Sequence, residues 1–496
     1  MILLVENDTS YTNDLRAMLQ AFYSGERITG VSPNQVADYN RELFSEFRFV
    51  FTALFMEKHT RLRLEEGGKV VFTAYINGDY EEKSRFRNKL KLAAYRLLCE
   101  YTGRELPWGS LTGMRPTKIA TKALADGLQR DEIIDGYMEA YMVSEEKAAL
   151  AVDVAEREQE ILSSVDPVTD YCLYVGIPFC PSRCLYCSFT SYPIDMYRDA
   201  IAEYLDCLIR ELQIISFINR KRRLVSIYIG GGTPTSLDAG HLDQLLAAIE
   251  ANFDLSNLRE YTVEAGRPDS LTRDKLMALK RHKVSRISIN PQTMRDRTLQ
   301  LIGRAHTSDD VMRAFRMARE VGDYHINMDL IAGLPEETAD DMRYTLGVIE
   351  KLQPDSLTVH SLAVKRASEL KNQPEMITKT VHKDTDRMLR LADVSARKMG
   401  LTPYYLYRQK NISGNLENVG YAKKPCIYNV LIIEEKVDIF AAGAGSVTRV
   451  LRMDPETGDV TGIDRAEDVK NIDQYLQRIE EMIERKRTAV EHELRF

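Results

Sequence analysis

The sequence lacks the long apolar segments of a membrane protein. No apolar run in its 496 residues reaches the roughly 18 that a membrane-spanning helix needs. Its short apolar start has no basic segment before it, so it does not predict a signal peptide. Positive charge is not in excess either, since the formal net charge is -7 at pH 7. Bulk charge therefore favours neither nucleic acid nor an anionic membrane as a partner, and we expect a monomeric, cytoplasmic protein.

Cysteine is scarce and unevenly placed. There are 7 cysteines, and three of them fall within CPSRCLYC (180–187), which is not the pattern of a disulfide framework. Thiolates suit an iron–sulfur cluster. Cys180, Cys184 and Cys187 can hold three corners of a [4Fe–4S] cube and leave the fourth iron open to chelate a methionine. Zinc is the alternative, but it wants a fourth protein ligand, and the closest histidines, His241 and His282, are far downstream. The remaining cysteines are predicted to be buried as small apolar residues: Cys99, Cys172, Cys207 and Cys426.

The chain divides by pattern into three predicted domains: 1–165, 166–365 and 366–496. The first is predicted to be an α/β domain, with a strand at 69–78, a helix at 84–103 and a charged connecting helix at 144–163. Its role is not indicated by the sequence. The basic residues of the helix at 84–103 could face RNA or an acidic partner, but a solvated helix face is the favoured interpretation.

The middle domain alternates short apolar strands with amphipathic helices. This order predicts an α/β fold with a parallel sheet and right-handed crossovers, and six units rather than eight predict an open, partial (β/α)6 TIM-like barrel. The expected strands are 171–178, 224–230, 260–266, 284–290, 324–333 and 356–362, and the expected helices are 195–216, 239–252, 271–282, 308–321 and 337–352.

The last domain is predicted to be an α+β region. We expect a helix at 380–399, a strand at 430–435, a glycine-rich turn at 441–448 and a closing helix at 471–487.

The cysteine motif that follows the first of these strands resembles the signature of the radical S-adenosylmethionine (radical SAM) superfamily. The run YVGIPFCPSRCLYCSF resembles the oxygen-independent coproporphyrinogen III oxidase group, and the likeness extends over about residues 170–450. The segments PWGSLTGMRPTK and GNLENVGYAKKPCIYN are similar to a coproporphyrinogen dehydrogenase paralogue of that group. The resemblance implies a [4Fe–4S] cluster on Cys180, Cys184 and Cys187, with SAM as the second cofactor.

The resemblance also implies which residues contact SAM. A glycine-rich strand end by itself is usually a turn, and Tyr174 could be a core tyrosine. An aspartate within an apolar strand, such as Asp329, is costly to bury unless it is paired, which favours a functional role. A second SAM beside the first would be contacted by Gln292, Arg304 and Asp329. The full implied set is Tyr174, Tyr186, Gly231, Gly232, Thr233, Glu264, Gln292, Arg304, Asp329, Ala363 and Val447. No catalytic acid or base is singled out.

By resemblance, the activity is the oxidative decarboxylation of coproporphyrinogen III to protoporphyrinogen IX in haem biosynthesis. The partners would be this tetrapyrrole and an electron donor such as flavodoxin or ferredoxin. The alternatives are a haem-binding chaperone, against which the segment CIYNVL (426–431) weighs, and another radical SAM reaction on a tetrapyrrole. From composition alone, Arg183, Arg267 and Arg408 are candidate partners of the propionates, with a solvated surface charge as the default. The sequence departs from the oxidase pattern at Gly176, Ser188–Phe189, Ala265–Gly266 and Asn290–Pro291.

Overall fold

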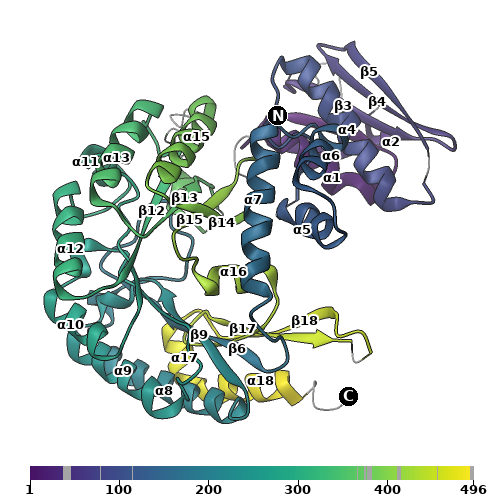
Figure 1. Cartoon of the computed structure of the whole chain (residues 1–496). Helices are drawn as coiled ribbons and strands as arrows, with labels where there is room; N and C mark the ends of the chain where they lie inside the picture. The colour runs from purple at the N-terminus through teal and green to yellow at the C-terminus, as the bar shows by residue number, and fades with distance from the viewer. Residues whose placement is uncertain are drawn as a thin grey trace. The chain divides into compact units, whose positions relative to one another are not determined.

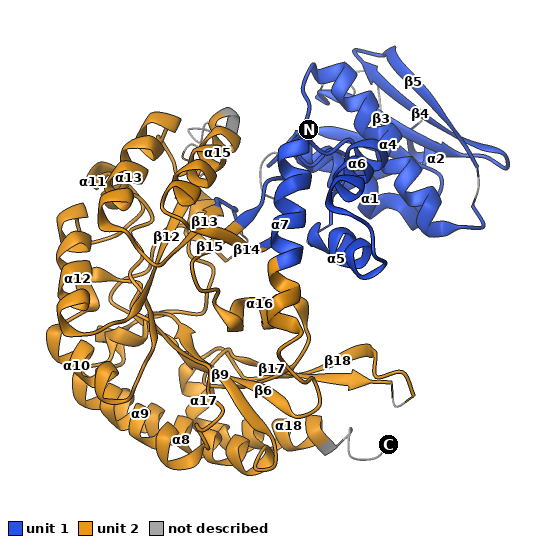
Figure 2. Cartoon of the chain, in the orientation of Figure 1, with its two compact units in different colours: residues 1–156, 361–364, 406–418 blue, residues 157–360, 365–405, 419–496 orange. Residues whose placement is uncertain are grey.

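The computed structural model describes residues 1–36, 46–78, 80–113, 115–365, 367–373, 376, 382–409, 415–454 and 456–491. The chain forms two compact units, coloured separately in Figure 2. Unit 1 comprises residues 1–156, 361–364 and 406–418, and unit 2 comprises residues 157–360, 365–405 and 419–496. The three predicted domains remain a prediction about independent folding.

Unit 1 is built on a mixed five-stranded sheet in the order β2-β1-β3-β4-β5. Strand β4 shows why the sheet forms: along His59–Glu66, Thr60, Leu62 and Leu64 are buried, and every second residue is less buried, as the twofold repeat of a strand requires. The predicted helix at 84–103 is α4 (Lys83–Thr102), which ends at Gly103 with a left-handed φ of 63°. The other elements are β1 (Ile2–Glu6), α1 (Thr12–Phe22), β2 (Ile28–Val31), α2 (Pro33–Val36), β3 (Phe49–Phe55), β5 (Lys69–Asn77), α5 (Thr117–Ala125), α6 (Arg130–Tyr141) and α7 (Glu145–Leu162), the last of which continues into unit 2.

Unit 2 contains the strand–helix repeats. Strands β6, β9, β10, β11 and β12 pair in parallel, each with the next, and β13 follows beside β12. The sheet then continues at both edges, and the ends of β13, β14 and β15 are counted with unit 1. In sheet order the strands are β14 (Thr402–Tyr407), β15 (Asn418–Ala422), β13 (Ser356–Ser361), β12 (His325–Ala332), β11 (Arg286–Ser288), β10 (Glu260–Glu264), β9 (Arg223–Gly231), β6 (Asp170–Ile177), β16 (Asp438–Ala442), β17 (Val447–Met453) and β18 (Val460–Glu467).

The helices that connect the parallel strands cover the outer face of the curved sheet (Figure 1). Helix α12 (Ser308–Val321) shows the local cause. Thr307 and Asp310 form a reciprocal capping box at its start, and a buried apolar stripe that includes Val311 and Phe315 faces the strands. The other covering helices are α8 (Ile201–Ile218), α9 (Ala239–Asn252), α10 (Arg273–Arg281) and α13 (Ala339–Leu352).

The predicted open barrel of six strand–helix units is confirmed, and the strands that the structure describes do not close it. Two predictions in the last region are wrong. The apolar run at 430–435 is not a strand but most of helix α16 (Ile427–Glu434), because a short apolar run suits a buried helix as well as a strand. The helix at 471–487 is broken at Arg478 into α17 (Ile472–Gln477) and α18 (Ile479–Glu491).

Helix α15 (His382–Lys398) matches the helix expected at 380–399 within the residues that the structure describes. Throughout those residues, every helix is too short or too polar to cross a membrane.

Candidate functional site

The three clustered cysteines lie where β6 ends. Cys180 closes the two-residue strand β7 (Phe179–Cys180), and the other two follow in a loop. The amide of Leu185 in this loop donates to the Ile302 carbonyl oxygen at 3.1 Å, and the Leu185 carbonyl accepts the amide of Leu370 at 2.9 Å. The backbone therefore holds the cysteine loop from two sides.

The surroundings of these thiols fit an iron–sulfur cluster. A guanidinium nitrogen of Arg267 lies 3.6 Å from the Cys184 sulfur, so a positive charge lies directly beside this proposed ligand. A Cβ atom on Gly232 would lie 3.0 Å from the Cys180 sulfur, so only glycine leaves this space open. Burial raises the pKa of the Cys180 thiol to about 11, and a bound iron would displace that proton. Among the described residues, no three His, Cys, Asp or Glu side chains form a site for a single metal ion.

Arg267 is a part of this loop's support. It is 3% exposed and forms an ion pair with Asp269 at 2.7 Å. It also donates to the carbonyl and hydroxyl oxygens of Ser182 at 3.2 and 3.1 Å. The default interpretation of Arg267 as a solvated surface charge is therefore wrong.

The glycine-rich end of β9 lies against the cysteine strand. Gly231 has a φ of 107°, which favours glycine. The amide of Gly232 donates to the Ile177 carbonyl at 2.8 Å, and the amide of Thr233 donates to the Phe179 carbonyl at 2.7 Å. The Thr233 hydroxyl lies 3.4 Å from the Cys180 sulfur. These predicted residues are thus brought together with the first cysteine.

Glu264, the last residue of β10, is paired with a tyrosine that the sequence analysis did not single out. The Tyr228 hydroxyl donates to a Glu264 carboxylate oxygen at 2.6 Å. Burial, with a smaller contribution from the charge of Asp329, raises the pKa of Glu264 to about 7, and the Tyr228 hydrogen bond opposes that rise. The Tyr228 ring stacks on Tyr428 of α16 at 4.6 Å and on Tyr174 of β6 at 6.2 Å between centroids. The predicted Tyr174 is therefore one member of an aromatic stack beside this carboxylate.

Gln292 and Asp329 are neighbours through their backbones. The Gln292 amide donates to the Asp329 carbonyl at 2.9 Å. Gln292 has a φ of 66°, a strained conformation for this residue type, and its buried side-chain oxygen has no hydrogen-bond partner. Asp329 accepts from Asn327 at 2.7 Å and is 20% exposed. A buried acceptor without a partner and a partly solvated carboxylate are typical of a site that binds a polar ligand.

Arg304 is buried beside the cysteine loop. One guanidinium nitrogen donates to the Asn290 carbonyl at 2.6 Å, and the other donates to the Tyr186 hydroxyl at 3.2 Å. This joins Arg304 to Tyr186, which lies between the last two cysteines. The contact of Arg304 with a second SAM stays a prediction, and the structure shows that this side chain orders the cysteine loop.

Ala363 and Val447, the last two residues of the implied SAM set, lie next to strand ends. Ala363 follows β13 and is counted with unit 1, and Val447 begins β17 opposite Glu467. Their contacts with SAM stay predictions. Arg183 is half-buried in the cysteine loop and donates to the Ala367 carbonyl at 2.8 Å. Arg408 is 3% exposed in unit 1 and donates to backbone carbonyls at 111 and 113, so it is not a solvated surface charge.

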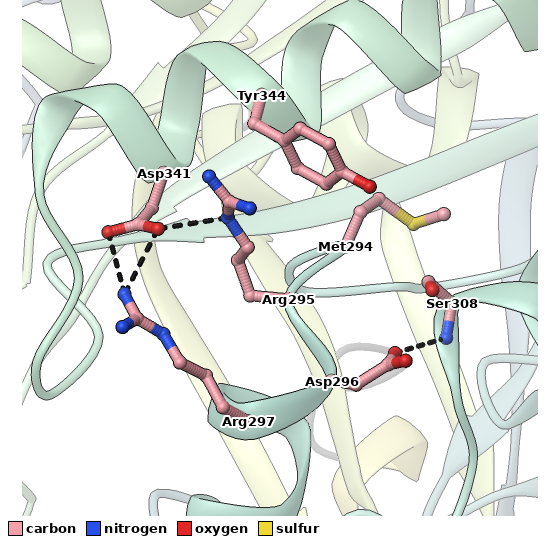
Figure 3. A pocket seen from close by; sticks show the side chains of 7 residues that line it. All are labelled: Met294, Arg295, Asp296, Arg297, Ser308, Asp341 and Tyr344. Carbon is pink, nitrogen blue, oxygen red and sulfur yellow. Dashed lines mark hydrogen bonds and ion pairs between the residues drawn. The ribbon is translucent and has the colours of Figure 1, made fainter.

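A separate surface pocket of about 470 Å³ lies beside α13 (Figure 3). Arg295 and Arg297 both point toward the Asp341 carboxylate, at 2.9 and 3.0 Å. Arg295 also lies over the Tyr344 ring, 3.9 Å from its centroid. Asp296, on the same wall, accepts the Ser308 amide. Two cations and two carboxylates neutralise one another here, which does not single out a charged ligand.

The chain is similar to several known proteins. The model of the Radical SAM superfamily matches residues 174–349. The oxygen-independent coproporphyrinogen-III oxidase-like protein HemZ of Bacillus subtilis is 38% identical over 429 residues, covering 85% of each chain. The heme chaperone HemW of the same organism is 38% identical over 195 residues, which cover 39% of this chain and half of the chaperone. The solved structure of coproporphyrinogen III oxidase (HemN) from Escherichia coli aligns with a TM-score of 0.49 and 22% identity over 66% of this chain and 73% of that one.

Proposed function

The chain belongs to the family of oxygen-independent coproporphyrinogen III oxidase-like proteins in the radical SAM superfamily, and from this premise we propose an enzyme that modifies a tetrapyrrole. The cofactors of the superfamily are a [4Fe–4S] cluster and SAM. Under this proposal, Cys180, Cys184 and Cys187 hold the cluster. When bound, the two cofactors would supply radical chemistry through the reductive cleavage of SAM, and the protein would position and shield them.

The observation that carries the proposal is the convergence of the predicted residues at one edge of the sheet. The thiol of Cys180, the glycines that end β9 and Glu264 come from consecutive strands, and Arg304 reaches the same loop. The carboxyl ends of parallel strands are where such folds place their chemistry. Glu264 supplies a carboxylate for the ammonium group of SAM, and its proton equilibrium near neutral pH is set by burial and by Tyr228.

We propose that the reaction is the oxidative decarboxylation of coproporphyrinogen III. A hydrogen atom is abstracted from a propionate side chain, and the substrate then loses CO2 and passes one electron to an acceptor, which leaves a vinyl group. Two such events give protoporphyrinogen IX. The support for this substrate is the 38% identity to HemZ over 85% of both chains.

An anaerobic assay tests the proposal. Protein with a reconstituted cluster is incubated with SAM, dithionite, an electron acceptor and coproporphyrinogen III. The expected products are 5′-deoxyadenosine and, after oxidation, protoporphyrin. Deoxyadenosine without any vinyl product would reject this substrate and retain radical chemistry.

A haem-delivery protein is the second candidate, favoured by the 38% identity to HemW over 195 residues. It predicts stable haem binding in the absence of SAM cleavage. Equilibrium titration with haem, followed by absorbance, separates the two candidates when it is combined with the deoxyadenosine assay.

A further inference from the structure

An aromatic side chain lies exposed directly beside the predicted cluster ligands. Phe189 follows Cys187 by two residues and is 65% exposed. An exposed phenylalanine ring lacks the hydrophobic stabilisation that burial against a partner would give it. The ring is also not isolated, because the ammonium group of Lys365 lies 5.8 Å from its centroid in a cation–π arrangement.

Positive charge is concentrated at the same place, although the chain as a whole is acidic. Lys365 and Arg183 both lie within electrostatic reach of the Cys187 thiol. The segment 180–190 carries one cation and no acid, and the described residues of 365–373 carry two cations and one acid. The backbone joins the two segments, since the amide of Leu370 donates to the Leu185 carbonyl. The cysteine loop therefore carries a local excess of positive charge beside an exposed aromatic ring.

We propose that Phe189, Lys365 and Arg183 form the docking surface for an acidic one-electron donor protein that reduces the cluster. This inference rests on the proposed function, because only a redox cluster needs such a donor. Each transfer oxidises the donor by one electron and reduces the cluster by one, and no proton or group moves with it.

The location and the charge together support this partner. Electron transfer between proteins weakens steeply with distance, so a donor must bind next to the ligand loop, where this surface lies. An acidic carrier is attracted by the local cations and repelled by the remainder of a chain with a net charge of -7. The exposed ring supplies apolar contact at the centre of the charged rim, as small interfaces require.

The test compares two reductants on the full-length protein with its cluster reconstituted. The production of 5′-deoxyadenosine from SAM is measured with dithionite, which needs no docking surface, and with reduced flavodoxin. The affinity of flavodoxin for each protein is measured separately by calorimetry, and Lys365→Gln and Phe189→Ala should both weaken it. We expect Lys365→Gln and Phe189→Ala each to lower the flavodoxin-driven rate about tenfold at low salt while the dithionite-driven rate stays within about twofold. Lys365→Arg, which keeps the charge and the cation–π contact, is expected to restore most of the flavodoxin-driven rate.

The chain offers a matched control at the other end of the strands. Phe217 at the end of α8 is 64% exposed, and the Arg220 guanidinium lies 4.6 Å from its centroid, where β9 is about to begin. Phe217→Ala and Arg220→Gln are expected to leave both rates unchanged.

Other outcomes would overturn the docking surface. Equal loss with both reductants would place Phe189 and Lys365 in SAM cleavage itself, or on the substrate face. Unchanged rates with both reductants would show that flavodoxin binds elsewhere. Wild-type protein that makes no deoxyadenosine even with dithionite would overturn the proposed function, and the docking surface with it.

Discussion

Two sets of buried polar side chains, one in each unit, differ in how fully their hydrogen bonds are satisfied. In unit 1, Glu417 is buried and accepts from the Trp108 indole at 2.6 Å and from the Lys147 ammonium at 2.7 Å. In unit 2, the buried side-chain oxygen of Gln292 has no hydrogen-bond partner, and Glu264 has a pKa of about 7. Buried polar groups are usually satisfied. The satisfied group is therefore interpreted as a structural element, and the incompletely satisfied groups support the proposed SAM site.

The largest effect is expected at the cysteine loop. Cys184→Ala removes one of the three proposed iron ligands, so the protein should lose the brown colour of the cluster and all measurable SAM cleavage. Iron content, visible absorbance and deoxyadenosine production measure this. Cys172→Ala is the matched control, because Cys172 is fully buried within β6 and outside the loop. A coloured, active Cys184→Ala protein would contradict the ligand assignment.

The buried hydrogen-bonded group of Glu417, Trp108 and Lys147 in unit 1 should contribute to stability and not to SAM cleavage. Glu417→Gln removes the nearer of two carboxylates that pair with the buried Lys147 ammonium, at 2.7 Å against 3.9 Å for Glu146, which costs about 3–5 kcal/mol of the free energy of unfolding. Denaturant titration measures this, and the rate of SAM cleavage per folded molecule should be unchanged. The control is Glu480→Gln, which breaks the exposed ion pair with Arg210 and should cost about 1 kcal/mol or less. Similar losses for the two variants would remove the distinction between buried and exposed pairs.

The Glu264 carboxylate and its hydrogen-bond partner Tyr228, both in unit 2, should affect the pH dependence of SAM binding. The pKa of Glu264, about 7, means that the carboxylate is lost as the pH falls through neutrality, so SAM should bind more weakly there. Tyr228→Phe removes a hydrogen bond that lowers this pKa, so the pH at half-maximal binding should rise. At neutral pH the Tyr228→Phe variant should lose about 1 kcal/mol of the free energy of SAM binding, which is about fivefold in affinity. Calorimetric titration from pH 6 to 9 measures both, and an unchanged profile would separate Tyr228 from SAM binding.

The sequence predicted the parallel strands and their helices because each repeat has a clear period and clear end signals. The observed β12 (His325–Ala332) lies within the expected 324–333, and α9 has the expected bounds 239–252. Helix α16 was missed because apolar residues lie on every side of it. Such a helix lacks the periodicity that distinguishes a helix from a strand.

Within the candidate site, motif residues could be named from sequence, but their partners could not. Tyr228 lies in an apolar strand with no local mark of function, and its pairing with Glu264 depends on the register of β9 against β10. Tyr428 reaches the same stack from a helix about 200 residues later in the chain. Long-range contacts of this kind depend on tertiary packing, which no local pattern records.

The smallest effect on stability is expected at the surface pocket of Figure 3, where the charged residues are partly exposed. Asp341 accepts from Arg295 and Arg297 and also caps α13 through Thr338. Asp341→Asn keeps a capping side chain and removes one charge, so it should cost about 1 kcal/mol of the free energy of unfolding. SAM affinity should not change, because the pocket is neutralised by its own residues and no predicted SAM residue lines it. Thermal denaturation and SAM titration measure the two effects, and weaker SAM binding in this variant would show that the pocket is coupled to the site.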